Sequence, residues 1–328
     1  MPITSLEPEF EPVRVGMIGV GRHARLILLP ALAFVPEIQL CALATAHEET
    51  ARLASTRYRT PAYVGYERLL AEAEDLDAVL VVGGKHGEEM RAVLEAGKHI
   101  WCETPAVTDL AESAALRELA AEKGLQVEVG SCLRHAPIYQ RLKHELEDWN
   151  QVRRAPRLFQ AAYYPYVGHF YNLFQYLNGP WSAVSALRGP AETLVHLRFA
   201  NGDLGAVVSR RFKNDSIPFE RVSVTAEDGM LVADNGRDLR RYHAPEARSG
   251  MDLSFDTASA DLVGPTFSMP YGQLNHLYLR GYIPELRHFA RMIRRGAPSA
   301  CGLAEMEDSL RIRQAIARAA ESHAWEDV

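Results

Sequence analysis

The sequence is poor in cysteine, and the few cysteines that it has follow no metal-binding or disulfide spacing. Cys41, Cys102, Cys132 and Cys301 are scattered along the chain, without a C-x-x-C pair. Zinc-binding and disulfide frameworks need more regular spacing, so we predict no metal site. Cys41 and Cys102 lie in apolar, strand-like segments and Cys132 follows another, which indicates buried free thiols.

The sequence also lacks any apolar run long enough to span a bilayer. Residues 1–12 are acidic and contain prolines, and they have no apolar core of the kind found in signal peptides. We therefore expect a cytoplasmic protein with no membrane partner.

An excess of positive charge is missing as well. The chain has 36 basic and 42 acidic residues, which gives a formal net charge of −6. This balance argues against general nucleic-acid binding. The short basic runs at 210–213 and 291–295 are interpreted as solvated strand ends and helix faces, and a small-molecule substrate is the expected partner.

What the sequence does have is a regular alternation of two hydrophobic periods. At 328 residues the chain is long for one core, so two domains are expected. In the first domain, residues 1–130, apolar strands alternate with helices, which indicates an α/β, doubly wound parallel sheet of the Rossmann type. The predicted strands are 13–18, 38–45, 78–82, 99–102 and 126–130, and the predicted helices are 25–34, 48–57, 66–73, 88–96 and 109–123.

The second domain, residues 131–328, follows a different pattern. Its strands succeed one another without helices between them, and Ala200-Asn201-Gly202-Asp203 has the composition of a hairpin turn. We predict an α+β domain with a mostly antiparallel open sheet, a long irregular loop over 244–280 and two closing helices. The predicted strands are 157–164, 183–187, 193–199, 204–210, 221–225 and 230–232, and the closing helices are 282–295 and 304–324.

A glycine-bearing turn joins the first strand to the first helix. Residues 19–24 read Gly-Val-Gly-Arg-His-Ala, which matches the dinucleotide fingerprint G-x-G-x-x-A in its required setting of strand, turn and helix. Gly19 permits the tight turn, Gly21 lets a pyrophosphate approach the backbone, and Ala24 lets helix and strand pack closely. With Arg22 and His23 between them, these residues predict a binding site for a pyridine dinucleotide.

Further motifs, together with the fingerprint, resemble the Gfo/Idh/MocA family, which is named for glucose–fructose oxidoreductase and inositol dehydrogenase. They are Glu95-Ala96-Gly97-Lys98-His99-Ile100-Trp101-Cys102-Glu103-Thr104-Pro105, Arg134-His135-Ala136-Pro137, Gly168-His169 before Gln175-Tyr176-Leu177-Asn178-Gly179, and the helical close at 303–322. The resemblance implies a first domain that binds NAD or NADP. It also implies a second domain whose open sheet covers the nicotinamide and makes homodimers or homotetramers.

The sequence departs from the family pattern at three places. The family's Glu-Lys-Pro motif has its lysine beside the nicotinamide, and Thr104 stands there; Pro165 stands where the family has an aspartate, four residues before His169. The loop after the fourth strand is Gly83-Gly84-Lys85-His86, two residues shorter than in the family. A threonine hydroxyl cannot replace an ammonium as acid or electrostatic clamp, so the family's sugar-dehydrogenase chemistry does not transfer directly.

Three residues are the candidates for proton handling. His169 matches the family's histidine, although a lone histidine at a helix start is often a packed core residue. Lys85 follows a strand that ends at the ligand edge of the sheet, with Gly83 and Gly84 giving the backbone room, although a solvated loop lysine is the alternative. Tyr166, with the tyrosines at 163 and 164, is a candidate proton donor or an aromatic packing residue.

The cofactor choice depends on the end of the second strand. NAD enzymes carry a carboxylate there, whereas this chain has Thr45 followed by Ala46 and His47. A neutral Thr45 removes the repulsion that excludes a 2′-phosphate, and His47, Arg22 and Arg52 offer partners for it, which favours NADP over NAD. The alternative is that this strand end binds either cofactor. The resemblance places the carboxylate of Glu103 near the nicotinamide ribose, with Thr104 next to it.

Three hypotheses for function follow. The first is an NAD(P)-dependent oxidoreductase that moves a hydride between nicotinamide and a sugar-, polyol- or imine-like substrate. The second is an inactive NAD(P)-binding sensor or corepressor, because the family's lysine and aspartate are absent and one fold hosts several functions. The third is redox-neutral chemistry on a retained cofactor.

Overall fold

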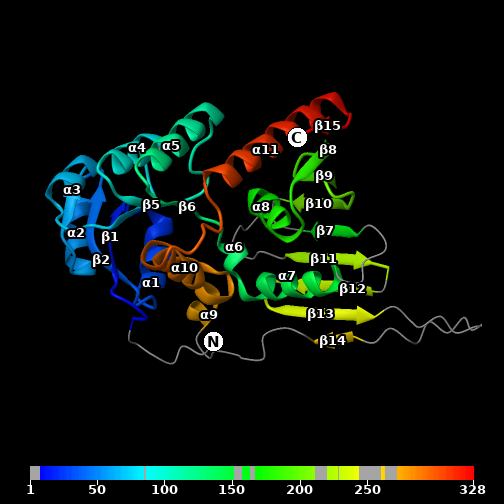
Figure 1. Cartoon of the computed structure of the whole chain (residues 1–328), viewed down its shortest axis with the longest axis horizontal. Helices are drawn as coiled ribbons and strands as arrows, with labels where there is room; N and C mark the ends of the chain where they lie inside the picture. Colours follow the sequence, from blue (N-terminus) through cyan, green and yellow to red (C-terminus); the bar gives the residue numbers. More distant parts are fainter. Residues whose placement is uncertain are drawn as a thin grey trace, which may run out of the picture. The chain divides into compact units, whose positions relative to one another are not determined.

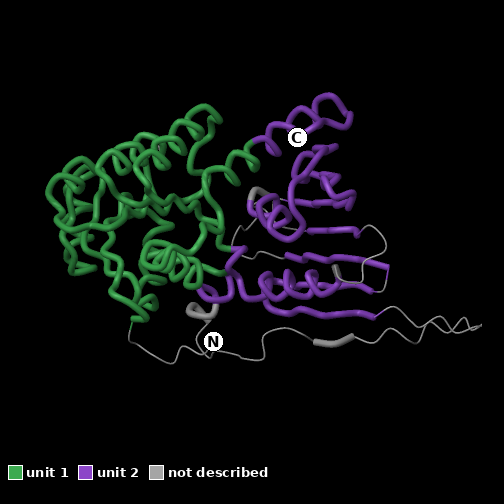
Figure 2. The backbone as a smooth tube through the Cα atoms, in the orientation of Figure 1, with its two compact units in different colours: residues 1–132, 281–310 green, residues 133–280, 311–328 purple. Residues whose placement is uncertain are grey.

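The computed structural model describes residues 8–84, 86–150, 157–162, 167–210, 220–227, 229–243, 260–262 and 272–328. The chain forms two compact units: unit 1 comprises residues 1–132 and 281–310, and unit 2 comprises 133–280 and 311–328 (Figure 2). The expected division is a single one at residue 130, whereas the chain returns to unit 1 for 281–310. That segment contains helix α10 (Tyr282–Arg295), whose apolar period predicts a buried face but not the unit that covers it.

Unit 1 is built on six parallel strands in the order β3-β2-β1-β4-β5-β6 (Figure 1). The order reverses between β1 and β4, which makes this pair the switch point of a doubly wound sheet and confirms the predicted α/β class. Only β3 has no counterpart among the predicted strands, because it is a short edge strand whose three residues are only partly buried. The strands are β1 (Val13–Ile18), β2 (Ile38–Thr45), β3 (Ala62–Val64), β4 (Ala78–Val81), β5 (His99–Cys102) and β6 (Val127–Val129).

The helices of unit 1 follow the predicted alternation, and α10 completes the unit by contacting α1, β1 and β2. An ion pair supports this packing, since Nε of Arg287 on α10 lies 3.1 Å from Oε1 of the buried Glu37, which precedes β2. The helices that precede α10 are η1 (Ala24–Leu28), α1 (Leu29–Leu32), α2 (Glu48–Tyr58), α3 (Tyr66–Glu72), α4 (Gly87–Glu95) and α5 (Leu110–Glu122).

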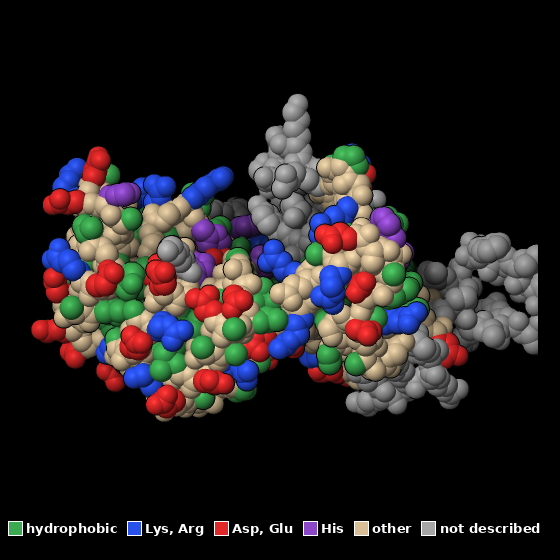
Figure 3. All heavy atoms as spheres, turned by 90° about the horizontal axis from the view of Figure 1, so that it is seen from above, with side chains coloured by type: hydrophobic (Ala, Val, Ile, Leu, Met, Phe, Trp, Pro, Cys, Tyr) green, Lys and Arg blue, Asp and Glu red, His purple; other side chains and the backbone are tan. Residues whose placement is uncertain are grey.

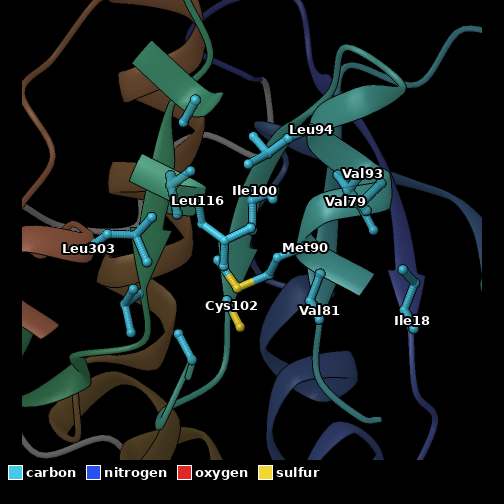
Figure 4. Close-up of a cluster of buried hydrophobic side chains, with 14 of the residues drawn as sticks. Ile18, Val79, Val81, Met90, Val93, Leu94, Ile100, Cys102, Leu116 and Leu303 are labelled. Atoms are coloured by element: carbon cyan, nitrogen blue, oxygen red, sulfur yellow. The ribbon is translucent and has the colours of Figure 1, made fainter. Parts of the chain in front are cut away.

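The core of unit 1 fills the space between its central strands and helices α4 and α5 (Figure 4). Val79, Ile100, Cys102 and Met90 are all fully buried there, so the face of the sheet that α4 and α5 cover is closed to water. All four cysteines are free thiols. Cys102 and Cys132 are buried as predicted, and Cys301 is buried too, whereas Cys41 is only half-buried.

Unit 2 contains a nine-stranded sheet in the order β14-β13-β12-β11-β7-β10-β9-β8-β15. Every neighbouring pair is antiparallel except β7 and β10, which are parallel. The sheet therefore has the mostly antiparallel character that the sequence predicts. The strands are β7 (Leu158–Ala162), β8 (Trp181–Arg188), β9 (Glu192–Phe199), β10 (Leu204–Arg210), β11 (Arg221–Ala226), β12 (Gly229–Asp234), β13 (Asp238–His243), β14 (Ala260–Leu262) and β15 (Glu326–Asp327).

The predicted hairpin turn of unit 2 is present between β9 and β10. Asp203 in this turn is fully buried. Its Oδ1 accepts the backbone N–H of Arg157 at 2.7 Å, and its Oδ2 lies 3.3 Å from Nη2 of the same arginine. The turn thus fixes the start of β7 as well as the hairpin, because a buried carboxylate needs such partners.

The helices of unit 2 lie partly where the sequence predicts a loop. Within the expected irregular loop 244–280, strand β14 and helix α9 are formed, so this expectation is wrong for their residues; 244–259 and 263–271 lie outside the described residues. The helices are α6 (Cys132–His135), α7 (Pro137–Asn150), α8 (Val167–Asn178), α9 (Gly272–Leu279) and α11 (Leu303–Ser322), of which α6 and α11 span the division between the units. In the described part of the chain, no helix is both long and apolar enough to cross a membrane.

Candidate functional site

The turn after β1 lies at the switch point of the unit 1 sheet, directly against the turn after β4. Gly19 has a φ of +95°, and a Cβ on it would meet N of Gly83 at 2.5 Å and Cα of Gly83 at 2.7 Å. Gly83 in turn donates its N–H to O of Ile18 at 3.1 Å. Only glycine fits at position 19, for both its backbone conformation and this close approach.

Gly21 is in a different situation. A Cβ added to it would meet no described atom of the chain within 4 Å, so the packing of the chain does not require glycine there. Its carbonyl oxygen accepts the N–H of Arg25 at 3.1 Å. The surface above Gly21 is therefore open to a ligand, which is what a fingerprint glycine provides.

The helix after this turn begins irregularly. Residues of η1 form a π-helical turn, in which the N–H of Leu29 donates to O of Ala24, and α1 follows with Pro30, which has no N–H to continue a regular ladder. Such π turns occur often at functional sites. Ala24 is fully buried, as close packing of helix on strand requires, and Arg22 is exposed.

His23 contacts a carboxylate at the end of β5. Its Nε2 lies 3.3 Å from Oε2 of Glu103, and its ring lies 6.0 Å from that of Tyr282 at the start of α10. Burial alone would lower the pKa of His23, but the contact with Glu103 and the charge of Glu103 raise it by more, so that the pKa lies above its ordinary value. The end of β1, the end of β5 and the start of α10 thus meet in one polar cluster.

The end of β2 carries no carboxylate. Thr45 is buried, and its hydroxyl donates to O of His47 at 2.9 Å, while its own carbonyl accepts the N–H of Gly65. His47 is exposed and precedes α2, whose first turn contains the exposed Glu48 and Glu49. The end of β2 is therefore neutral, and the nearest carboxylates in the sequence after it are those of Glu48 and Glu49 in α2.

The loops after β4 and β5 are joined by a contact between His86 and Pro105. Nδ1 of His86 lies 3.0 Å from O of Pro105, and the Thr104–Pro105 peptide is cis. Gly84 has a φ of +94°, and a Cβ on it would collide with the carboxylate of the buried Glu89. Lys85 lies outside the described residues.

A buried carboxyl group that the sequence analysis did not single out lies next to this region. Glu285 on α10 is 1% exposed, and its Oε1 accepts the backbone N–H of Ser131, just after β6, at 2.5 Å. Burial raises its pKa well above the usual range, partly offset by the Ser131 N–H, and the charges of Glu103 and Glu128 raise it further. A first-turn glutamate in an amphipathic helix has no signal in sequence that separates it from a solvated one.

The proton-handling candidates belong to unit 2 or to residues that are not described. His169 lies half-buried in the first turn of α8. Tyr166, Pro165 and the tyrosines at 163 and 164 lie outside the described residues. The dinucleotide candidates all lie in unit 1, at or just after the carboxyl ends of β1, β2, β4 and β5: Gly19, Gly21, Arg22, His23, Ala24, Thr45, His47, Gly83, Gly84, Glu103 and Thr104.

Charge is distributed evenly over the face drawn in Figure 3, where Lys and Arg side chains are interspersed with Asp and Glu and no broad patch of one sign forms. In the described residues, no group of three or more His, Cys, Asp or Glu side chains is placed to hold a metal ion.

The same region carries the similarity to known proteins. Residues 13–131 match the model of an oxidoreductase family with an NAD-binding Rossmann fold. The chain is 38% identical over 117 residues to dTDP-3,4-didehydro-2,6-dideoxy-alpha-D-glucose 3-reductase of Saccharopolyspora spinosa, a match that covers 35% of each chain. It is 34% identical over 140 residues to inositol 2-dehydrogenase/D-chiro-inositol 3-dehydrogenase of Shouchella clausii, which covers 41% of this chain and 40% of the relative.

These matches span about a third to two fifths of the relatives' length, whereas the fold is shared throughout. The structure of levoglucosan dehydrogenase in complex with NADH and levoglucosan has a TM-score of 0.80 to this chain at 22% identity, and covers 97% of this chain and 99% of that one. At this identity the likeness establishes the two-unit fold alone.

Proposed function

The chain belongs, through residues 13–131, to the Gfo/Idh/MocA family of oxidoreductases, and from this membership we propose that it is an NAD(P)-dependent oxidoreductase. It transfers a hydride between nicotinamide C4 and a carbonyl, hydroxyl or imine carbon of a small sugar-, polyol- or imine-like substrate. The observation that carries the proposal is the pair of glycines at the switch point: Gly19 is required by the contact with Gly83, whereas Gly21 is required by no described atom of the chain.

In this proposal the dinucleotide lies along the carboxyl edge of the unit 1 sheet, where ligands bind in doubly wound folds. Backbone amides after Gly19 and Gly21, with Arg22, His23 and Ala24 at the helix start, hold the pyrophosphate. Thr45 and His47 hold the adenosine ribose. Gly83, Gly84, Glu103 and Thr104 follow β4 and β5, on the side of the sheet where the nicotinamide half lies.

We propose NADP as the preferred cofactor and NAD as the alternative. The neutral end of β2 supports this choice, because no carboxylate stands where NAD enzymes hold the ribose hydroxyls. The exposed Glu48 and Glu49 at the start of α2 oppose it, and His47 offsets them. Titration calorimetry with NADPH and NADH tests the choice: a lower dissociation constant for NADPH supports it, and a clear NADH preference overturns it.

For the chemical step, the proposal assigns proton transfer to His169, with Lys85 or Tyr166 assisting. The chain needs such a group because Thr104 replaces the family's lysine, and a missing general acid costs about 10²–10⁴-fold in rate. An assay of reduced-nicotinamide absorbance across sugars, polyols and imines tests the reaction. Turnover supports the proposal, and substrate conversion without a net absorbance change indicates redox-neutral chemistry instead.

The replacement at Thr104 keeps a second candidate function open, that of a catalytically inactive NAD(P)-binding sensor or corepressor. Cofactor binding with no turnover on any substrate of the panel favours the sensor. Restoring the lysine distinguishes the oxidoreductase from the sensor further. A gain of activity in Thr104→Lys would show that the rest of the site can carry out the reaction.

The proposal includes a homodimer or homotetramer formed through the unit 2 sheet, in the cytoplasm, with no nucleic-acid or membrane partner. Two large apolar side chains on neighbouring strands, Leu194 of β9 and Leu204 of β10, are 37% and 49% exposed, which suits a face covered by another copy. Light scattering tests this: a monomer at micromolar concentration overturns it, as does a Leu204→Lys variant with unchanged mass.

A further inference from the structure

The motif Arg134-His135-Ala136-Pro137 has no role in the proposed function, yet its arginine makes well-defined contacts in unit 2. Arg134 on α6 is 7% exposed. Its Nε donates to Oδ1 of Asn172 on α8 at 2.6 Å, and Nη2 lies 3.5 Å from O of the same residue. Its guanidinium carbon also lies 5.6 Å from the centroid of the Tyr176 ring, one turn further along α8.

A second cation reaches the same helix from α7, which packs against α8. Nζ of Lys143 donates to the backbone O of Tyr176 at 2.6 Å and lies 4.8 Å from the centroid of its ring. Tyr176 is in the last turn of α8, where carbonyl groups lack partners within the helix and the helix dipole is negative. Lys143 therefore caps the carboxyl end of α8, two turns away from His169.

Arg134 acts at a different level of the helix. Asn172 follows His169 by three residues, which makes the two side chains neighbours on the helix surface, with Cβ atoms about 5–6 Å apart. A helical side chain leans toward the preceding turn, and for Asn172 that is the turn of His169. By holding Asn172 in place, Arg134 therefore also restrains the turn of α8 that carries the imidazole of His169.

The charged groups around α8 are mostly cations. Besides Arg134 and Lys143, Arg157 at the start of β7 donates to Asn178 at the end of the helix, and its own counterion is Asp203. The charges of Arg188 and Arg313 act on Tyr171, and the charge of Glu147 acts on Tyr176. Within this set, Arg134 contacts Asn172, one turn after His169, and its charge does not titrate in proteins.

We propose that Arg134 is a positioning residue for His169, acting through Asn172. It holds the first half of α8 in one place, and it keeps a fixed positive charge at Asn172, one turn after His169. The inference rests on the proposed function only in taking His169 as the acid–base group; the contacts of Arg134 do not depend on any substrate. It gives the motif at 134–137 a function apart from cofactor binding.

The test follows the His169 ring directly, so that it needs no substrate. The full-length protein is labelled with ring-¹³C histidine, and the His169 resonance is identified by its loss in His169→Gln. In Arg134→Met, removal of a neighbouring cation should raise the titration midpoint of His169 by about half a pH unit or more, since like charge disfavours the imidazolium. Asn172→Leu leaves Arg134 in the chain but removes its hydrogen bond to the Asn172 side chain, and should give a shift of the same sign.

A double variant tests whether Arg134 and Asn172 act together on His169. If Arg134 acts through Asn172, the shift in Arg134→Met/Asn172→Leu equals that of either single variant, because coupled residues are not additive. Lys143→Met is the matched control: it removes a cation from the same helix at Tyr176, and should give less than half the shift. Should Arg134→Met not fold, Asn172→Leu and Lys143→Met carry the test.

An unchanged His169 midpoint in both Arg134→Met and Asn172→Leu overturns the inference. So does an equal shift in Lys143→Met, which would show a general effect of charge. The proposed function fails separately, when no dinucleotide binds or no substrate turns over. Where turnover is found, Arg134→Met should lower kcat about 10-fold or more with KM within about twofold, because an interaction lost only in the transition state lowers kcat and kcat/KM together.

Discussion

Arg294, near the end of α10, pairs with Asp77, just before β4. Its Nη2 lies 2.5 Å from Oδ2 of Asp77, and the same oxygen accepts the backbone N–H of Arg14 on β1 at 2.8 Å. Nη2 of Arg294 also donates to O of Pro12 at 2.9 Å. Residues separated by more than 200 positions therefore hold the amino ends of the two central strands together.

Loss of this arginine should destabilise unit 1. We expect Arg294→Met to lower the free energy of unfolding by about 1–2 kcal/mol, the range for charge-assisted hydrogen bonds that are partly exposed. Urea denaturation measures the change. Arg295→Met is the control, because Arg295 is 54% exposed and pairs with the exposed Glu9; equal effects in the two variants would contradict the assignment.

The two fingerprint glycines should respond differently to alanine. Gly19→Ala is expected to destabilise the fold, since its Cβ meets the backbone of Gly83 and its φ is +95°. Gly21→Ala should leave the melting temperature unchanged, because the new Cβ meets no described atom of the chain. It should nevertheless weaken dinucleotide binding by about 10-fold or more, which corresponds to about 1.4 kcal/mol.

Calorimetric titration and thermal denaturation of both variants check this prediction. A Gly21→Ala protein that binds NADPH and NADH as tightly as the unsubstituted chain would show that the ligand does not approach this turn.

Glu285 should make stability depend on pH. Its pKa is raised in the folded state, so its stabilising contribution is complete below the unfolded value, near pH 4.5, and is lost as pH rises through the folded value. In the Glu285→Gln variant, the side-chain amide keeps an acceptor for the Ser131 N–H but does not ionise. The melting temperature of this variant relative to the unsubstituted protein should therefore increase as pH rises above the unfolded value toward the raised folded value. A constant difference would show that Glu285 is already ionised at the acidic end of that range.

The pKa of His23 should depend on the carboxylate of Glu103. Its folded pKa is raised, so the stability that the pair contributes is present below the ordinary value of 6.5 and is lost as pH rises through the folded value. In Glu103→Gln the opposing burial remains while the negative charge is gone, so the pKa of His23 should fall. Histidine NMR measures the titration midpoint of His23 in the two proteins, and an equal midpoint in both would contradict the assignment.

Much of unit 1 could be predicted from sequence, because its signals are local. The run at 13–18 and the glycines at 19 and 21 place β1, its turn and the ligand edge in one short stretch. The apolar alternation then predicts a parallel sheet. The positions of Thr45 and Glu103 follow, since each comes directly at or after the end of a strand.

The contributions of distant segments could not be predicted in this way. Helix α10 has a clear apolar face, with Leu286 and Phe289 fully buried, but periodicity does not tell which sheet the face covers. The contacts of Tyr282 with His23 and of Glu285 with Ser131 depend on that choice. The contact between Arg134 and Asn172 could not be predicted for the same reason, because the two residues lie on different helices, 38 positions apart in the sequence.

The division of unit 1 between residues 1–132 and 281–310 (Figure 2) bears on how the protein is made. As the chain leaves the ribosome, the six strands of the parallel sheet emerge early, but α10 emerges only after unit 2 has been synthesised up to residue 280. Until then the surface that α10 covers, including parts of β1 and β2, stays exposed, and exposed apolar surface on incomplete domains is prone to aggregation. Nascent chains stalled before residue 281 should consequently be the ones that require a chaperone.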